Sequence, residues 1–468
     1  MMNSSTYVLI LPCILWALLC RYYSIFSNYN IPHFTVNTVP DRLLMNTMIF
    51  TLLFLIYTVN YCLSKRYKEI PFSVKISIIL AFTVTSILNI LTHPIGGSDV
   101  FNYIINCKVS YYHHLNPYTH SFEPFGGEHL AKYLKVINKP LGFGPAWIIL
   151  SYVPSMFMDF TSIVSMILWY KVYNCLFLAG TAILIYHYQD SDRKWISLYL
   201  FLMNPLILFE GLVNGHNDIM MTFFLIFAIF KLRQNSIYSL PLLTLSALIK
   251  FFTLPLFPLF IIESYRKHRQ MNKIVLSCLL SFLVIIILFL PYWDKGNMIK
   301  GMLSGMSSYH NTGGLSIPSI MKGYMKVNKL GGISYVTPVF GIIFLIFLFI
   351  ETFFIKGTTE ERMTVLLTFF LITVSLFYPW HFIPVLTVLT FCESKRHVTY
   401  LFTATFSSMA FYPLSVWLLN FSGLSVFYAY LCLSLLMLLP VIIFFIGTVI
   451  LNCYLKIPYF SGKQISKV

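Results

Sequence analysis

The fold class is decided by residues 274–291, which read IVLSCLLSFLVIIILFLP. The stretch contains no charged residue, and at about 1.5 Å per residue in a helix it nearly matches the hydrocarbon thickness of a bilayer. Helices of water-soluble domains carry a polar face, which is absent here. The stretch therefore predicts a helix embedded in a membrane.

Comparable apolar stretches recur along the 468 residues. They lie at 7–26, 44–63, 73–91, 160–188, 195–213, 219–230, 335–355, 363–377, 398–419 and 426–451. The composition agrees, because 58% of the residues are hydrophobic and only 10% are charged, against about 25% charged in soluble domains. We expect an all-α polytopic membrane protein, a single integral-membrane domain over residues 1–468. It should contain about 11 to 14 transmembrane helices, broken or re-entrant segments included.

Two stretches are irregular. Residues 237–262 hold Lys250 and several prolines, and residues 381–391 are too short to cross a membrane alone. With a cytoplasmic N-terminus, most of the 32 Lys and Arg fall in short cytoplasmic loops, as the positive-inside rule requires. This orientation holds only if 237–262 enters and leaves on the same side, as two half-helices broken near Lys250.

The same orientation places two long loops at the outer face. Residues 92–144 form the first, which we expect to be a catalytic loop with interfacial helices, and residues 292–334 form the second. The net charge of +16 then reflects membrane topology, and no nucleic-acid partner is expected. The cysteines lie mostly in apolar runs and indicate no disulfide framework.

Only 16 residues are acidic, which leaves few candidates for chemistry that needs a carboxylate. Asp99 lies in GGSDVFNY, residues 96–103, at the outer end of a predicted span; the plain alternative is that it caps the following helix. Asp218 closes NGHND, residues 214–218, where polar side chains crowd at the bilayer edge. Such groups are costly to desolvate unless they pair or bind a ligand, although a turn that caps the next helix is again the plain alternative.

A cation and an aromatic–histidine motif add to these carboxylates. Lys250 lies in SALIKFFTLP, and an embedded lysine indicates a functional site with phosphate as a natural partner, unless it snorkels to the interface. The stretch YPWHFIP places Trp380 and His381 at an outer span end, where an aromatic belt explains the tryptophan better than the histidine. The loop histidines match no zinc motif, so no metal ligand is expected.

In chain order, the outer motifs resemble those of a known family. They are GSDVFNY (97–103), LNPY (115–118), GFGPAW (142–147), NGHND (214–218), ALIK (247–250) and PWH (379–381). The set resembles the integral-membrane glycosyltransferases of the GT-C fold, and within them the polyprenyl-phosphate-mannose-dependent α-1,6-mannosyltransferases. The resemblance spans roughly 94–384. It implies a hexosyltransferase that moves mannose, with inversion, from a polyprenyl-phosphate donor to a lipid- or glycan-linked acceptor at the outer membrane face.

The resemblance also implies residue roles. Asp99 would be the general base, and Lys250, His216 and His381 would meet the charge of the donor phosphate. The implied sugar or acceptor contacts are Asn217, Asp218, Asn116, Tyr118 and Trp380. Besides the donor and the acceptor, membrane lipids are the expected partners of the protein. Some relatives carry a paired acidic motif where this chain has a single aspartate, so the resemblance leaves metal use open and no cofactor is assigned. Residues 146–157 are expected to form an interfacial helix that guides the lipid.

Three other functions compete. A lipid or polysaccharide transporter or flippase would need polar residues through the membrane depth, whereas these cluster at one face. A membrane acyltransferase would need an acyl-donor path from the cytoplasmic side, whereas most histidines face outward. A structural partner in an envelope assembly would not explain Lys250 or the NGHND turn.

Overall fold

The computed structural model describes residues 4–27, 40–67, 69–121, 139–190, 193–310 and 314–455. Within these ranges every regular element is a helix, and β-structure is limited to a single bridge between Ser24 and Thr92. In chain order the elements are α1 (Ser4–Tyr22), α2 (Pro40–Ser64), α3 (Phe72–Ile90), α4 (Asp99–Cys107), η2 (Lys108–Tyr112), α5 (Pro145–Ser155), α6 (Ile163–Tyr188), α7 (Lys194–Leu202), α8 (Pro205–Leu208), η5 (Phe209–Val213), α9 (Asp218–Arg233), α10 (Ser239–Ile249), η6 (Phe251–Leu256), α11 (Phe257–His268), α12 (Met271–Phe289), η7 (Leu290–Tyr292), η8 (Asp294–Gly296), α13 (Asn297–His310), α14 (Ile317–Val327), α15 (Ile333–Phe353), α16 (Thr359–Thr373), η9 (Pro379–His381), α17 (Phe382–Leu389), α18 (Lys395–Asn420) and α19 (Val426–Leu455). The predicted all-α class is confirmed.

Seven of the described helices are long and apolar enough to cross a membrane, namely α2, α3, α6, α12, α15, α18 and α19. The pair Lys194–Leu202 and Pro205–Val213, bent by 49°, makes an eighth candidate. Shorter apolar helices lie at Ile10–Tyr22, Ser239–Ile249 and Pro379–Leu389. The chain is therefore a multi-pass membrane protein, and the crossing number expected from the sequence is reached only when these shorter helices are counted.

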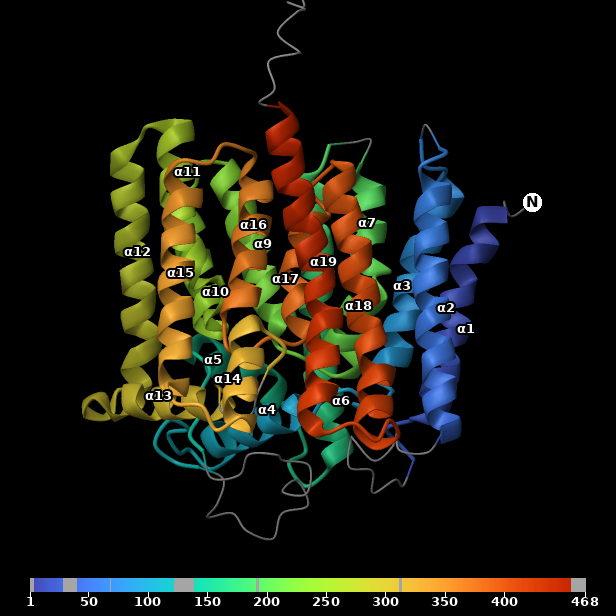
Figure 1. Ribbon diagram of the computed structural model, residues 1–468, viewed down its shortest axis with the longest axis horizontal. Helices are drawn as coiled ribbons and strands as arrows, with labels where there is room; N and C mark the ends of the chain where they lie inside the picture. The colour runs from blue at the N-terminus through green and yellow to red at the C-terminus, as the bar shows by residue number, and fades with distance from the viewer. Residues whose placement is uncertain are drawn as a thin grey trace, which may run out of the picture.

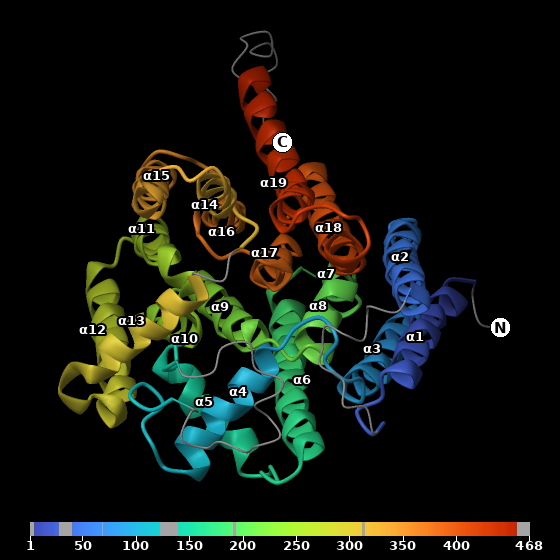
Figure 2. The same ribbon diagram turned by 60° about the horizontal axis from the view of Figure 1, so that its bottom comes forward.

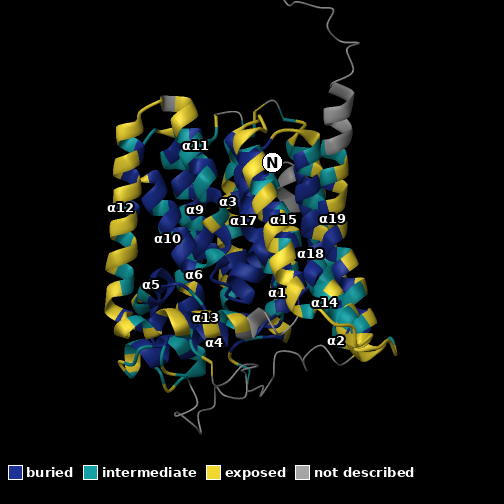
Figure 3. Cartoon of the chain, turned by 60° about the vertical axis from the view of Figure 1, so that its left-hand side comes forward, coloured by how far each residue is buried: buried dark blue, intermediate teal, exposed yellow. Residues whose placement is uncertain are grey.

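The peripheral helices present hydrocarbon to their surroundings. On α12 the side chains of Leu279 and Phe282 are 60% and 62% exposed, and α15 carries a similar exposed apolar face (Figure 3). Exposed apolar area on this scale is unfavourable in water and suits a lipid environment. The buried core lies further in, around α6, α9, α10 and α17 (Figure 3).

Residues 237–262 form the re-entrant hairpin that the charge distribution predicts. Helix α10 ends at Ile249, Lys250 is extended (φ −148°, ψ 124°), and the chain turns through η6 into α11. The loops that flank the hairpin meet, because the Asn235 side-chain amide donates a hydrogen bond of 3.1 Å to Oε1 of Gln270. Both ends therefore lie on one side of the bundle.

A second hairpin explains why residues 381–391 are too short for a crossing. Helix α16 begins at a capping box of Thr358 and Glu361, and α17 returns to the same end. There the hydroxyl of Tyr188 donates to Glu360 near the start of α16, and the Gln189 amide donates to the Thr390 carbonyl just after α17, at 3.2 Å. The stretches 363–377 and 381–391 are thus two arms of one hairpin.

The long loops and the basic loops lie at opposite ends of the bundle. Figure 1 shows the N-terminus and the turn between α11 and α12 at one end, with α4 and α13 lying across the other end. We call these the basic end and the loop end. Residues 122–138 of the first long loop, and 311–313 of the second, lie outside the described residues.

A buried ion network joins three helices at the basic end. Arg362 of α16 is 2% exposed and donates to Glu263 of α11. Its Nε lies 3.7 Å from Oε1 of Glu351 on α15, and its Nη2 donates to the Thr352 carbonyl at 2.9 Å. The guanidinium therefore has two carboxylates to balance its charge, which a buried cation needs.

Candidate active site

Three chain reversals bring the candidate residues together. They are the turn 214–217 before α9, the break at Lys250, and η9 between α16 and α17. The imidazole of His216 stacks on the indole of Trp380, with ring centroids 4.3 Å apart and planes inclined by 16°. Gly215 takes φ +71°, and a Cβ there would meet the side chain of Val100 on α4 at 3.0 Å, so this turn needs a glycine.

His216 lies between two carboxylates. Its Nδ1 is 3.6 Å from Oδ2 of Asp99, and its Nε2 is 3.3 Å from Oε2 of Glu210. The side chain is fully buried, yet neither ring nitrogen makes a well-formed hydrogen bond to the described residues. Buried polar atoms are usually paired, so these nitrogens mark a place where a polar substrate group would find a partner.

Asp99 is the first residue of α4 and faces His216. Ser98 occupies the N-cap position without a side-chain capping bond, and the Asp99 carboxylate stays 28% exposed. Apart from Asn106, the rest of α4 is buried; Tyr103, for example, packs on Trp147 and Tyr170 at centroid distances of 5.4 and 5.7 Å. Aromatic side chains of α5 and α6 therefore cover one side of α4.

Glu210 is the residue that sequence reasoning missed. Its fully buried carboxylate accepts hydrogen bonds from the Asn214 amide, at 2.7 Å, and from the Tyr412 hydroxyl. Oδ1 of Asn214 in turn accepts from the backbone N–H of Gly96 at 2.9 Å, which fastens the segment leading to Asp99 onto the turn of His216. The available signal was a lone acid in an apolar run, four residues before the asparagine of the NGHND motif.

Asp218 and Lys250 form an ion pair between α9 and the break after α10. The Lys250 ammonium lies 2.7 Å from Oδ2 of Asp218, the aspartate is fully buried, and the lysine side chain is 14% exposed. The other carboxylate oxygen of Asp218 has no hydrogen-bond partner among the described residues. The positive charge of Lys250 is thus largely balanced within the protein.

The remaining predicted residues near the turn have defined partners. Oδ1 of Asn217 accepts from the Tyr103 hydroxyl at 3.0 Å, while its side-chain nitrogen has no partner among the described residues. Nδ1 of His381 accepts from the backbone N–H of Tyr378 at 3.1 Å. The Trp380 indole also stacks on Tyr378, with centroids 4.8 Å apart. Trp380 therefore stacks on both His216 and Tyr378 and holds these two rings in place.

Asn116 and Tyr118 have contacts elsewhere. The Asn116 amide donates to the Tyr292 carbonyl at 2.9 Å, and the buried Tyr118 hydroxyl donates to the Phe143 carbonyl at 3.0 Å. The first bond holds the first long loop to η7, just after α12, and the second lies within that loop. Among the described residues neither bond joins Asn116 or Tyr118 to His216. No group of three or more His, Cys, Asp or Glu in the described ranges is arranged to hold a metal ion.

Helix α5 matches the apolar stretch 146–157 only in part. Trp147 is fully buried, and its indole N–H donates to the Tyr170 hydroxyl at 3.3 Å. Met156 and Phe157, at the far end, are 65% and 58% exposed. An interfacial role is therefore restricted to that end of the stretch.

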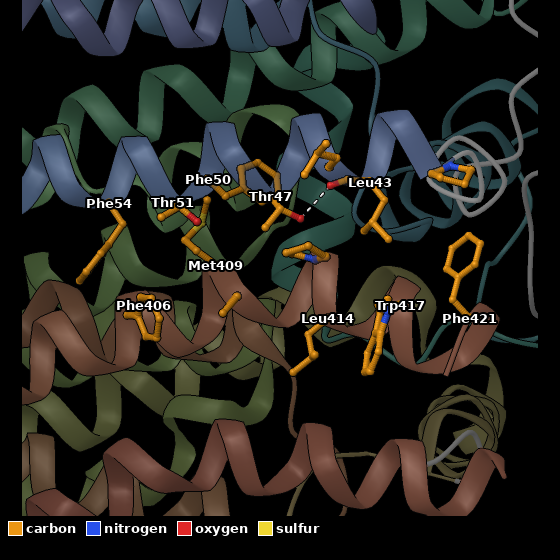
Figure 4. A pocket seen from close by; sticks show the side chains of 14 residues that line it. Leu43, Thr47, Phe50, Thr51, Phe54, Phe406, Met409, Leu414, Trp417 and Phe421 are labelled. Atoms are coloured by element: carbon orange, nitrogen blue, oxygen red, sulfur yellow. Dashed lines mark hydrogen bonds between the residues drawn. The ribbon is translucent and has the colours of Figure 1, made fainter. Parts of the chain in front are cut away.

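An apolar groove runs between α2 and α18 beside the site (Figure 4). Its cavity of about 650 Å³ is lined by side chains that include Phe54, Phe406 and Trp417. A smaller cavity next to it is lined by Phe50 and Tyr412, whose hydroxyl donates to Glu210. The side chain of Tyr412 thus separates the inner wall of the groove from Glu210, the acid beside His216.

One of the comparisons with known proteins gave a match. Residues 34–265 match the family model described as alpha-(1->6)-mannopyranosyltransferase, N-terminal domain, whereas no curated protein matched the chain. The matched segment contains Asp99, His216, Asp218 and Lys250, and the match favours a glycosyltransferase over a transporter. Together with its polytopic helical fold, the match, which covers 232 of the 468 residues, identifies the chain as a glycosyltransferase similar to the GT-C mannosyltransferases.

Proposed function

We propose that the protein transfers mannose from a polyprenyl-phosphate donor to a hydroxyl group of a lipid- or glycan-linked acceptor, with inversion and with Asp99 as general base. One observation carries the assignment of the base. Of the three carboxylates around the His216 turn, Asp99 is 28% exposed, whereas Glu210 and Asp218 are fully buried. A base must reach the proton it removes, and Asp99 alone of the three is open to an acceptor.

The reaction is a single displacement. The acceptor oxygen forms a bond to the anomeric carbon as the bond from that carbon to the phosphate oxygen breaks. The acceptor proton passes to the Asp99 carboxylate, and polyprenyl phosphate leaves with the bonding electron pair. One carboxylate that acts as a base on the incoming hydroxyl is the arrangement of inverting glycosyl transfer.

The residues around Asp99 supply binding groups for this step. Lys250 and His381, with His216, lie within electrostatic range of one another, and we assign them to the leaving phosphate. The unpaired side-chain nitrogen of Asn217 and the unpaired oxygen of Asp218 are suited to sugar hydroxyls. Trp380 supports these groups by stacking on His216.

The positive-inside rule supports an orientation with the loop end facing outward. The basic loops occupy one end of the bundle and α4, which carries Asp99, occupies the other (Figure 1). In this orientation donor and acceptor both meet Asp99 at the outer membrane face.

The test is an assay of purified protein with polyprenyl-phosphate mannose and, separately, a nucleotide-linked mannose, each offered with a membrane lipid extract. We expect transfer from the lipid donor only. Asp99→Asn should lower the rate by about 10²- to 10⁴-fold while the protein stays folded. Asp294→Asn, an exposed position at the same end, is the matched control. Transfer from the nucleotide sugar alone would reject the donor class, and a fully active Asp99→Asn would reject the base.

A further inference from the structure

A second cavity is lined by residues of α14, α15 and α19 at the loop end. Figure 2 shows α14 between the other two helices. The cavity measures about 810 Å³, within the size range of sites that hold a small ligand. Its lining combines cations, hydroxyl groups and apolar side chains, unlike the groove between α2 and α18, which has no charged residue. This mixture fits a ligand with a polar head and an aliphatic part.

Two lysines on α14 supply the cations. Lys322 and Lys326 are four residues apart, so they share one face of the helix, and both line the cavity. No carboxylate in the described residues forms an ion pair with either of them, in contrast to Lys250 with its partner Asp218. Partial burial lowers the pKa of Lys322, because the ammonium has lost part of its hydration, and a bound anion would offset that loss.

Hydroxyl groups surround the lysines. The Lys322 ammonium donates to the Ser375 hydroxyl at 3.2 Å, and Thr337 lies 3.0 Å from the same hydroxyl. Ser434 of α19 lines the cavity, is 1% exposed, and has no hydrogen-bond partner among the described residues. Ammonium and hydroxyl donors around one space are suited to phosphate oxygens. The apolar part of the lining includes Val327, Phe427 and Leu431.

Residues next to the cavity connect it to the candidate active site. Leu315, two residues before α14, donates a hydrogen bond of 3.0 Å from its N–H to the Phe377 carbonyl, just before η9. The next residue, Tyr378, stacks on Trp380. Tyr378 also lies within electrostatic range of both Tyr430, which lines the cavity, and Asp99. A ligand anchored in the cavity would therefore extend along Tyr378 toward the base.

We propose that this cavity binds the phosphate-bearing end of a lipid substrate, with Lys322 and Lys326 as the phosphate ligands. The inference rests on the proposed function, since it concerns the substrates of the same reaction. A lipid-linked acceptor can carry such a phosphate, which leaves the donor phosphate with Lys250, His216 and His381. If the phosphate is instead that of the donor, Lys322 and Lys326 replace those three residues as its ligands. The chemistry is the same in both cases, and kinetics separates them.

Binding is tested first, on the full-length protein in nanodiscs of neutral lipid. The probe is farnesyl phosphate, which has no sugar, and farnesol is the uncharged comparison. The double variant Lys322→Gln/Lys326→Gln should bind the phosphate at least tenfold more weakly than the unmodified protein, with farnesol binding unchanged. Lys300→Gln, an exposed lysine of α13 outside the cavity, is the matched control and should bind normally. Equal affinity in the double variant and the unmodified protein overturns the proposal.

Kinetics then assigns the source of the phosphate. A raised KM for the polyprenyl-phosphate sugar in the double variant assigns the cavity to the donor, and a raised KM for a phosphate-bearing acceptor assigns it to the acceptor. The corresponding Lys→Arg double variant should restore either value. If probe affinity falls while both KM values stay constant, the cavity binds bulk lipid and the proposal is rejected. If the unmodified protein transfers nothing from the lipid donor, the proposed function fails, while the probe measurement still decides whether the cavity binds phosphate.

Discussion

The ammonium of Lys250 lies 2.7 Å from a carboxylate oxygen of Asp218, although the two residues come from different helices. The pair links the first residue of α9 to the break in the α10–α11 hairpin. Because the aspartate is fully buried, its charge depends on Lys250 for compensation. A residue expected to meet the donor phosphate therefore also has a structural partner, and the two roles can be separated by mutation.

Removing one member of the Lys250–Asp218 ion pair should lower the free energy of unfolding more than removing both. Lys250→Met or Asp218→Asn should each lower the free energy of unfolding by about 3 to 5 kcal/mol, since each disrupts a buried ion pair. The double variant should be more stable than the sum of the single effects predicts, yet both variants that lack Lys250 should lose donor use. Denaturant unfolding of all four proteins, with KM for the donor, measures this cycle. Strictly additive stability losses would show that the pair contributes no coupling.

Glu210→Gln should lower transfer without unfolding the protein. The substitution keeps the size of the side chain but replaces the carboxyl group 3.3 Å from Nε2 of His216 by an amide. We expect a loss of about 10- to 100-fold, the effect typical of residues that orient a functional group, together with a displaced pH–rate profile. Tyr412→Phe removes one hydrogen bond to the same carboxyl group and leaves that group in place, so it serves as the control and should cost about 1 kcal/mol of stability. An unchanged rate and pH profile in Glu210→Gln would exclude this role.

Arg362→Met should destabilise the protein at the basic end and leave the chemistry intact. The change strands the buried carboxylates of Glu263 and Glu351, at an expected cost of about 3 to 5 kcal/mol. Arg266→Met is the matched control, because that side chain is 40% exposed and lies 3.7 Å from the same Glu263. It should cost about 1 kcal/mol or less. Thermal unfolding and the rate per folded molecule measure the two effects, and equal losses in the two variants would contradict the difference in burial.

The proposed orientation can be tested with single cysteines at the two ends. Asn328→Cys lies at the loop end, after α14, and Lys356→Cys lies at the basic end, after α15; both positions are exposed. A membrane-impermeant maleimide should label the first in intact cells and the second only after permeabilisation, with the unmodified chain as background. The opposite pattern would reverse the assigned faces.

The sequence predicted the class of fold and the hairpin at Lys250 because both follow from simple constraints. Apolar length identifies membrane helices, and the basic residues can share one side only if residues 237–262 return to it. It also selected Asp99 and His216, which the structure places side by side. The place of Glu210 beside His216 could not be predicted from the sequence. A lone acid in an apolar run can face either lipid or the protein core, and here the π-helical turn η5 determines which way it faces.

Contacts between distant segments were the other limit. LNPY has the composition of a ligand-binding loop. Its Asn116 and Tyr118 side chains nevertheless donate hydrogen bonds to the backbone carbonyls of residues 292 and 143, which are distant in the sequence. The stacking of His216 on Trp380 likewise depends on how α16 and α17 return, which no local pattern specifies. Motif order selected the candidate residues, and tertiary packing determines which of them lie close to His216.

The stacking of Trp380 on His216 also means that this part of the site can form only after residue 380 has been synthesised. Domains generally form from the N-terminus as the chain emerges, and the segment that matches the family model ends at residue 265. A nascent chain of that length already holds Asp99, His216 and Lys250, but the indole that packs against the imidazole has not yet been made. The proposed active site would therefore be completed only after α16 and α17 have inserted, and a chain stopped at residue 265 would lack the indole that packs on His216.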